Sequence, residues 1–256
     1  MKTGIQGHVR RKDTRKRLLG LFKTIILLVF VMSASALAAT YNAFTDFSIS
    51  NGNPNGVWSY GWSTTLLSSL NLYPHGFVDG SGNLDWNDPN HVFAGAPSNF
   101  ANPTNNQQGT VPAHSAAFHP GQSGEFSHYI WTAPTSGLFS LSATFSPLDT
   151  GGTDVHILED GSSLFAGNVS PGNPQSFSTQ LSLVAGDTID FAVGDGPDGT
   201  FQRDTTGISA TISNVPEPGT WVAAALGAFA VFGRIMRKMR RWQIRRRHRS
   251  CAAIYF

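Results

Sequence analysis

In Leu138-Phe139-Ser140-Leu141-Ser142-Ala143-Thr144-Phe145-Ser146, the apolar residues Phe139, Leu141, Ala143 and Phe145 alternate with small polar ones. Successive side chains of a β-strand point to opposite faces, so this stretch is typical of a strand with one buried face. Similar period-two runs follow every 10 to 15 residues, with turn signals such as Asp160-Gly161 between them. They predict an all-β fold in which antiparallel strands form a sandwich. The further runs are Thr153 to Glu159, Ser176 to Val184, Asp187 to Gly194 and Gly207 to Ser213.

The first half of the body has a weaker pattern. We expect strands over Ala43 to Ile49, Val57 to Trp62 and Glu125 to Trp131, and a long irregular insertion from Tyr73 to His119. The expected core consists of the inward members of the clearer runs. These are Phe139, Leu141, Phe145, Val155, Ile157, Leu181, Leu183, Ile189, Phe191, Val193 and Ile212.

Charge is divided unevenly along the chain. Of the 18 Lys and Arg residues, eight lie before Thr24 and nine after Gly233, so the stretch from Thr40 to Gly219 keeps only Arg203. The same stretch carries 15 of the 16 acidic residues, which gives it a formal net charge of −14. Basic residues beside apolar segments stay in the cytoplasm, so we expect both ends there and the body outside. An acidic body also excludes nucleic acid as a partner, because phosphate binding needs clustered Lys and Arg.

The N-terminal segment is organised as a secretory signal peptide. A basic region ending at Lys23 precedes the apolar run Thr24 to Met32, and small residues with an A-x-A pattern follow. This apolar run is shorter than the ~20 residues of a stable membrane span. Residues 1–39 are therefore predicted to be a signal peptide that is cut after Ala38 or Ala39. The alternative is an uncleaved N-terminal anchor.

The C-terminal segment, residues 215–256, combines three features in order. A Pro-Glu-Pro motif within residues 215–220 precedes the uncharged stretch Trp221 to Gly233, and an Arg-rich cluster ends the chain. The uncharged stretch gives about 20 Å of helix, short of a ~30 Å bilayer core. The difference closes if Arg234 and Arg237 snorkel to the interface. We therefore predict one transmembrane helix over 221–236 and a basic tail over 237–256; the alternative is a permanent anchor that is never cut.

This order of motif, helix and basic tail resembles the PEP-CTERM sorting signal of Gram-negative bacteria. The resemblance implies that an exosortase, a membrane protease, recognises Val215, Pro216, Glu217 and Pro218. It also implies that the protein is exported, held in the membrane by its C-terminal helix, and then presented at the cell surface or released outside the cell.

The body between the two signals, residues 40–214, has the length of one domain and contains no cysteine. Stretches such as Asn53 to Gly61, Thr153 to Ile157 and Ala185 to Phe191 resemble a set of uncharacterised PEP-CTERM ectodomains. Those ectodomains look like jelly-roll modules of the carbohydrate-binding kind. The resemblance therefore implies a single antiparallel β-sandwich of jelly-roll type.

Residue patterns of standard catalytic sites are missing from the body. Gly121-Gln122-Ser123-Gly124 lacks the spacing of a nucleophile elbow. His156 and Glu159 would point to opposite faces of a strand, and the six histidines of the body show no metal-ligand spacing. We therefore predict no enzyme activity, no catalytic residue and no organic cofactor.

A structural calcium ion is the one cofactor that the sequence suggests. Asp79, Ser81, Asn83 and Asp85 place oxygen atoms at positions 1, 3, 5 and 7 of a loop, as calcium loops do, although position 6 is Leu84 and not Gly. A second oxygen-rich segment contains Asp195, Asp198 and Asp204. The alternative is that Asp, Asn and Gly here only build turns.

Aromatic residues are the candidates for ligand binding. Trp58, Tyr60 and Trp62 alternate along one expected strand, so their rings share a face on which a sugar could stack; Trp86 is a further candidate. Alternating aromatics also fill sandwich interiors, so core packing is the alternative. Two functions follow: a module that binds extracellular polysaccharide, or a structural surface or biofilm-matrix protein without a specific ligand.

Overall fold

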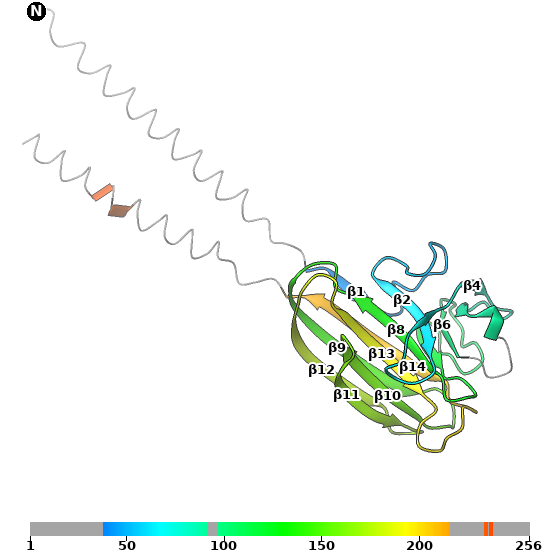
Figure 1. Cartoon of the computed structure of the whole chain (residues 1–256). Coiled ribbons are helices and arrows are strands. Elements are labelled where there is room, and N and C mark those ends of the chain that lie inside the picture. Colours follow the sequence, from blue (N-terminus) through cyan, green and yellow to red (C-terminus); the bar gives the residue numbers. More distant parts are fainter. Residues whose placement is uncertain (1–37, 92–96, 216–232, 235, 238–256) are drawn as a thin grey trace, which may run out of the picture. The chain divides into compact units, whose positions relative to one another are not determined.

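The computed structural model describes residues 38–91, 97–215, 233–234 and 236–237. The chain divides into two compact units, one of residues Ala38–Val215 and one that combines Met1–Leu37 with Pro216–Phe256. The first unit is built from strands, with a single short 3₁₀ helix at Pro89–His91 among its described residues. It is shown in Figure 1.

Two antiparallel sheets make up the Ala38–Val215 unit. The larger, eight-stranded sheet has the order β12 (Gln175–Leu183), β9 (Gly137–Pro147), β14 (Thr206–Asn214), β7 (Ser115–His119), β6 (Ser98–Asn102), β5 (Leu84–Asn87) and β4 (His75–Val78), with β1 (Thr40–Asn42) paired to β14. The smaller, six-stranded sheet has the order β11 (Ser162–Val169), β10 (Thr153–Glu159), β13 (Thr188–Gly194), β8 (Phe126–Thr132), β2 (Trp58–Ser63) and β3 (Asn71–Leu72). Figure 1 shows β4 and β6 on the side of the sandwich away from β11 and β12.

Aromatic side chains join the two sheets across the core. Phe118 of the larger sheet meets Tyr129 of the smaller one with ring centroids 4.6 Å apart, and Phe139 meets Trp131 at 5.2 Å. Both pairs adopt edge-to-face geometry, which aromatic rings prefer. The unit is therefore an all-β sandwich, and the predicted fold class is confirmed at that level.

Strands of the second half lie close to where the alternation places them. β10 has the predicted bounds, and β9, β12, β13 and β14 differ from the predicted runs by one residue at one or both ends. Of the expected core residues, only Leu181 is partly exposed, and it still packs against the buried cluster. Alternation was sufficient here because one face of each strand is apolar and the other carries Ser and Thr.

Two predictions for the first half are wrong. Residues Ala43 to Ile49 form turns and not a strand, because the Asn42 side chain accepts hydrogen bonds from the backbone of Phe44 and Thr45 and the Asp46 carboxylate accepts one from Asn42 N. The described residues of the expected irregular insertion Tyr73 to His119 contain four strands, β4 to β7, which extend the larger sheet.

The sandwich begins and ends at neighbouring points. Asn214 N donates to Ala39 O at 2.9 Å, and Val215 N donates to Leu138 O at 2.8 Å. Ordered pairing thus reaches from Ala39 to Val215. The predicted signal peptide, transmembrane helix and basic tail lie almost wholly outside the described residues. Among those that are described, no helix is long and apolar enough to cross a membrane.

Candidate functional site

Three of the four aromatic candidates lie inside the sandwich. Trp58 is 1 % exposed, Tyr60 0 % and Trp86 3 %, and the Tyr60 and Trp86 rings stack at 6.1 Å between the two sheets. Trp62, at the same face of β2, is half-buried and packs against the core. Burial and, next, the nearby Asp46 raise the pKa of Tyr60 well above its usual value, so its phenol stays neutral. The predicted sugar-stacking platform is therefore wrong, and the alternative, core packing, is what the structure has.

The first predicted calcium loop is closed on itself. Asp79 Oδ1 accepts hydrogen bonds from the backbone nitrogens of Ser81 (2.8 Å) and Asn83 (2.9 Å), and Oδ2 accepts one from Asn83 Nδ2 at 2.8 Å. Burial alone would raise the pKa of Asp79, but these bonds together outweigh it and lower the pKa. Asp79 thus serves the turn, as the turn-forming alternative had it.

The second predicted metal segment has a different character. Asp204 is 1 % exposed, and neither of its carboxylate oxygens has a hydrogen-bond partner among the described residues. Asp195 and Asp198 lie near enough to act on it electrostatically. Across the described part of the chain, however, no three His, Cys, Asp or Glu side chains gather in a metal-ligand arrangement.

A chain of Ser63, His128 and Asp190 escaped the sequence analysis. His128 Nδ1 lies 2.9 Å from Asp190 Oδ2, and His128 Nε2 lies 2.7 Å from Ser63 Oγ. The order matches a serine hydrolase triad. However, Ser63 is fully buried and donates its hydroxyl proton to Thr65 O at 2.8 Å. A nucleophile must reach its substrate, so the role of these three residues is structural. Their hydrogen bonds hold the segment after β2 in place. More than 60 residues separate each of the three from the next, and the sequence carried no signal for them.

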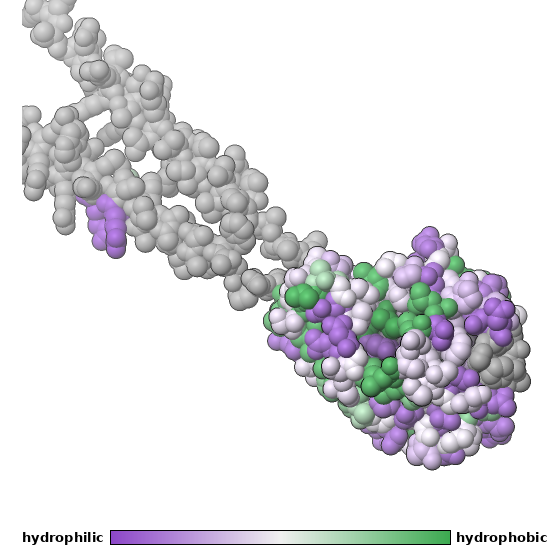
Figure 2. All heavy atoms as spheres, viewed as in Figure 1, coloured by the Kyte–Doolittle hydropathy of each residue, from purple (hydrophilic) through white to green (hydrophobic). Residues whose placement is uncertain are grey.

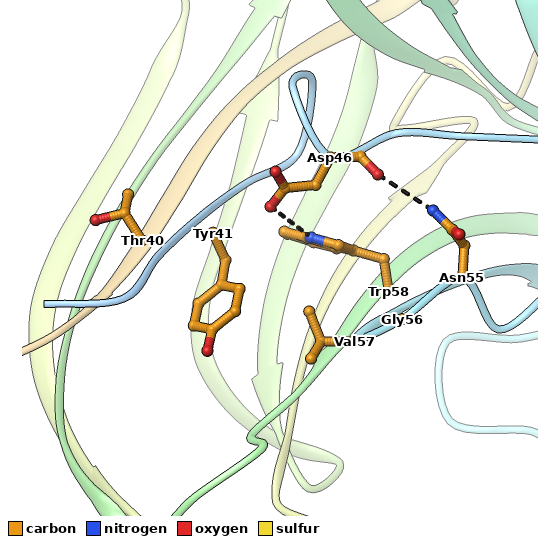
Figure 3. Close-up of a pocket in the computed structure, with 7 residues that line it drawn as sticks. All are labelled: Thr40, Tyr41, Asp46, Asn55, Gly56, Val57 and Trp58. Atoms are coloured by element: carbon orange, nitrogen blue, oxygen red, sulfur yellow. Dashed lines mark hydrogen bonds between the residues drawn. The ribbon is translucent and has the colours of Figure 1, made fainter. Parts of the chain in front are cut away.

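A shallow pocket lies where β1 meets the loop before β2, with a volume of about 370 Å³. It is lined by Thr40, Tyr41, Asp46, Asn55, Gly56, Val57 and Trp58. In Figure 3, the Asp46 carboxylate points to the indole nitrogen of Trp58, and the Tyr41 ring and Val57 lie to one side of this pair. The Trp58 Nε1–Asp46 Oδ2 bond is 3.3 Å long, and Asn55 Nδ2 donates to Asp46 O at 3.3 Å.

The pocket combines one aromatic face with polar groups. The Tyr41 ring is half-exposed and packs against Trp131 with centroids 5.4 Å apart, so its position is fixed by the core. Asp46 offers carboxylate oxygens, and Thr40 offers a hydroxyl group. Acceptors and donors beside an aromatic ring suit a ligand with hydroxyl groups and one apolar face. Sequence reasoning missed this pocket because Asp46 belongs to the segment Ala43 to Ile49, which was expected to be a regular strand, and because β1, which carries Tyr41, was not predicted.

Exposed large hydrophobic residues of the described surface include Leu67, Val78 and Val184, which come from separate segments. Figure 2 shows hydrophilic and hydrophobic residues interleaved over the visible side of the sandwich. The predicted sorting motif begins at Val215, the last paired residue; Pro216, Glu217 and Pro218 lie outside the described residues.

Comparison with known families identifies the tail. Residues 214–238 match the PEP-CTERM protein-sorting motif. A motif of this kind implies export to the cell envelope or surface. The match covers the Pro-Glu-Pro segment and the apolar stretch and leaves the sandwich unassigned. No curated protein matches the chain.

Solved structures resemble the sandwich only distantly. A CBM51 module from Clostridium perfringens GH95 in complex with methyl-galactose has 11 % identity and a TM-score of 0.29, over 39 % of this chain and 69 % of that one. A family 35 carbohydrate-binding module from Clostridium thermocellum has 19 % identity and a TM-score of 0.27, over 38 % and 77 %. Pika GITRL has 14 % and 0.25, over 36 % and 75 %. Similarities this weak, to proteins of different kinds, do not assign a ligand.

Proposed function

We propose that this chain is an exported protein that an exosortase-type protease processes at the cell surface. The observation that carries the proposal is the match of residues 214–238 to the PEP-CTERM protein-sorting motif. Two further features support it. The stretch from Thr40 to Gly219 has one basic residue against 15 acidic ones, and backbone pairing of the sandwich ends at Val215. The Pro-Glu-Pro segment thus follows the folded body directly, where prolines keep a chain extended for a protease.

Replacing Pro216, Glu217 and Pro218 together by Ala tests the sorting proposal. We expect a full-length form of higher mass that stays in the membrane fraction, while the parent protein is trimmed. Intact-mass spectrometry of the membrane and extracellular fractions distinguishes the two. A control with Pro171→Ala and Pro174→Ala, both on an exposed turn, should be processed normally. If the triple variant is trimmed and released like the parent, the tail is only an anchor.

The sandwich itself is proposed to be a jelly-roll module that binds extracellular polysaccharide. The strand orders β7-β14-β9-β12 and β8-β13-β10-β11 support the jelly-roll assignment. In each order, strands from the first half of this run (β7 to β10) alternate with strands from the second half (β11 to β14), as in two Greek keys. The pocket at Tyr41 supports the ligand class, since its volume of about 370 Å³ lies in the range of small-molecule sites. No catalytic role is proposed, because Ser63 is closed off.

Polysaccharide binding is tested at Tyr41. We expect Tyr41→Ala to weaken binding to the bacterium's own exopolysaccharide about tenfold, ~1.4 kcal/mol, and Tyr41→Phe to retain it, because stacking needs the ring and not the hydroxyl group. Affinity electrophoresis with the exported protein measures the effect. Leu67→Ala, an exposed apolar residue outside the pocket, is the control.

The second candidate is a structural surface or matrix protein without a specific ligand. Burial of Trp58, Tyr60 and Trp86 favours it, because the core uses these large rings and leaves few for a sugar. Equal migration of parent, Tyr41→Ala and Leu67→Ala through polysaccharide gels would support this candidate and reject the pocket.

A further inference from the structure

Two loops meet at one end of the sandwich and enclose Asp204. The loop between β9 and β10 runs beside the segment that leads into β14: Leu148 N donates to Thr205 O at 3.0 Å, and Gly151 N donates to Arg203 O at 2.8 Å. Hydroxyl groups of Thr153 and Thr206 lie 2.7 Å apart just beyond. Asp204 is therefore held by its backbone on both sides, and its position does not depend on a bond from its own carboxylate.

That carboxylate is buried without a partner. Its residue is 1 % exposed, and both oxygens lack hydrogen bonds within the part of the chain that the structure describes. A buried ionised carboxylate is strongly disfavoured unless a cation or several donors compensate it. Arg203, the sole Lys or Arg from Thr40 to Gly219, directs its Nη1 to Thr150 Oγ1 at 3.4 Å instead.

Main-chain oxygens converge on the same place. A Cβ added to Gly151 would stand 2.7 Å from Arg203 O and 2.8 Å from Gln202 O, and closer still to Asp204 Oδ1. Arg203 has a φ of 65°, an unfavourable conformation for a residue with a side chain. Asp204 Oδ1 and the carbonyl oxygens of Gln202 and Arg203 thus lie close together beside Gly151. Arg203 O accepts the hydrogen bond from Gly151 N, whereas the Asp204 carboxylate has no such partner in the described chain, and oxygens of like partial charge repel one another unless something positive compensates them.

The surroundings add negative potential. Asp198, Asp195 and Asp149 lie near enough to act on Asp204 electrostatically. Such a field attracts a divalent cation and repels anions. Oxygen ligands alone, with main-chain carbonyls among them, suit Ca²⁺, which takes six to eight of them in flexible geometry; Mg²⁺ demands a stricter octahedron and keeps its waters.

We propose that a calcium ion binds at this end of the sandwich, with the Asp204 carboxylate and the carbonyl oxygens of Gln202 and Arg203 as protein ligands. Asp195 and Asp198 act as outer negative charges that raise the local cation concentration. A single carboxylate among the ligands limits the affinity, so we expect binding in the range of extracellular calcium modules, on the order of 10⁻⁴–10⁻³ M. The ion would join the β9–β10 loop to the segment before β14.

Calcium titration of the exported protein tests this proposal. We expect the melting temperature of the parent to rise and saturate in millimolar CaCl₂, with a clearly smaller rise in MgCl₂ at equal ionic strength. Asp204→Asn should remove the saturable rise, and Asp198→Asn, at an exposed position, should weaken calcium binding several-fold without unfolding the protein. Asp79→Asn, in the self-closed loop, is the matched control and should respond like the parent.

Several results would overturn the proposal. No saturable response of the parent, or equal responses to Ca²⁺ and Mg²⁺, would show that no calcium site exists here. A response that survives in Asp204→Asn or disappears in Asp79→Asn would place calcium elsewhere. If Asp204→Asn does not fold, isothermal titration calorimetry of Asp198→Asn decides, since unchanged affinity in that variant rejects the proposed outer charges and with them the site.

Discussion

Two turns of the sandwich, both rich in aspartate and glycine, use their carboxylates in opposite ways. In the Asp79 turn, the backbone N–H groups of Ser81 and Asn83 donate hydrogen bonds to the Asp79 carboxylate. In the segment before β14, the carbonyl oxygens of Gln202 and Arg203 lie beside the Asp204 carboxylate, which accepts no hydrogen bond within the described chain. The direction of the peptide groups thus decides whether an acidic side chain stabilises its own turn or needs a cation.

The difference also concerns electrostatics. Hydrogen bonds lower the pKa of Asp79 against the effect of its burial, whereas burial and acidic neighbours raise the pKa of Asp204. Asp79 therefore favours its ionised form in the folded state, and Asp204 resists it. The presence of several Asp and Gly residues does not separate the two turns, since both have them.

The largest effect that this comparison predicts is at Gly151. A methyl group there would overlap Asp204 Oδ1 and two carbonyl oxygens, so Gly151→Ala should lower the free energy of unfolding by about 3 kcal/mol. Gly80, in the other turn, has open space around it and an ordinary φ, so Gly80→Ala should change stability by less than ~0.5 kcal/mol. Urea denaturation of both variants measures the contrast. Equal stability of the two would show that the oxygens around Gly151 move aside freely.

The fold of the second half of the body could be predicted from the sequence better than that of the first half. From Leu138 onward, five strands alternate, so their buried faces, and their bounds to within one residue, could be read from the sequence. The sixth, β11, was not predicted, because its burial does not alternate. Strand β6 was missed because buried polar residues interrupt its pattern, and β7 because its buried residues Ala116, Ala117 and Phe118 follow one another without alternation. Asn99 donates to His128 O, and Asn102 donates to the carbonyl oxygens of Val111 and Pro112. These side-chain amides donate hydrogen bonds to backbone carbonyl groups, and a hydropathy pattern cannot show that they are buried.

A second prediction concerns Asp85, on the strand that follows the Asp79 turn. Its Oδ1 is buried without a partner, and burial, then Asp79, raises its pKa to about 7. The folded state therefore holds a proton that the unfolded chain loses near pH 4. Stability should fall as pH rises from 4 to 7 and then level off, by about 2 kcal/mol after allowance for partial exposure.

Asp85→Asn should remove this part of the pH dependence, because an amide has no proton to lose in that range. Chemical denaturation at pH 5 and pH 8 measures it, with Glu159→Gln on the other sheet as the control. An unchanged difference between the two pH values in Asp85→Asn would assign the dependence to another group. Asp204 should contribute with the same sign in the absence of calcium, which makes the double variant with Asp204→Asn the flattest of all.

Only part of the candidate site could be inferred from the sequence. The tail was identifiable because its order of motif, apolar stretch and basic cluster is local. Period two showed that Trp58 and Tyr60 share a face, but which face lies inside depends on the partner sheet. Asp204 was named among other acidic residues, and its burial depends on Gly151, which is 53 positions away. The pocket at Tyr41 needed the pairing of β1 with β14.

The smallest predicted effect belongs to Asp79. Asp79→Ala removes three hydrogen bonds at an exposed turn, so the free energy of unfolding at pH 8 should fall by about 1 kcal/mol, and Asp79→Asn, which keeps acceptor capacity, should lose less. Both variants also remove a negative charge beside Asp85, whose pKa should drop as a result. The fall of stability with pH should still begin near pH 4, where the unfolded chain loses its proton, but end at lower pH than in the parent protein. If Asp79→Ala instead changes the calcium response and leaves the pH dependence unchanged, calcium would bind at the Asp79 turn. The direction of the peptide groups would then not be what distinguishes the two turns.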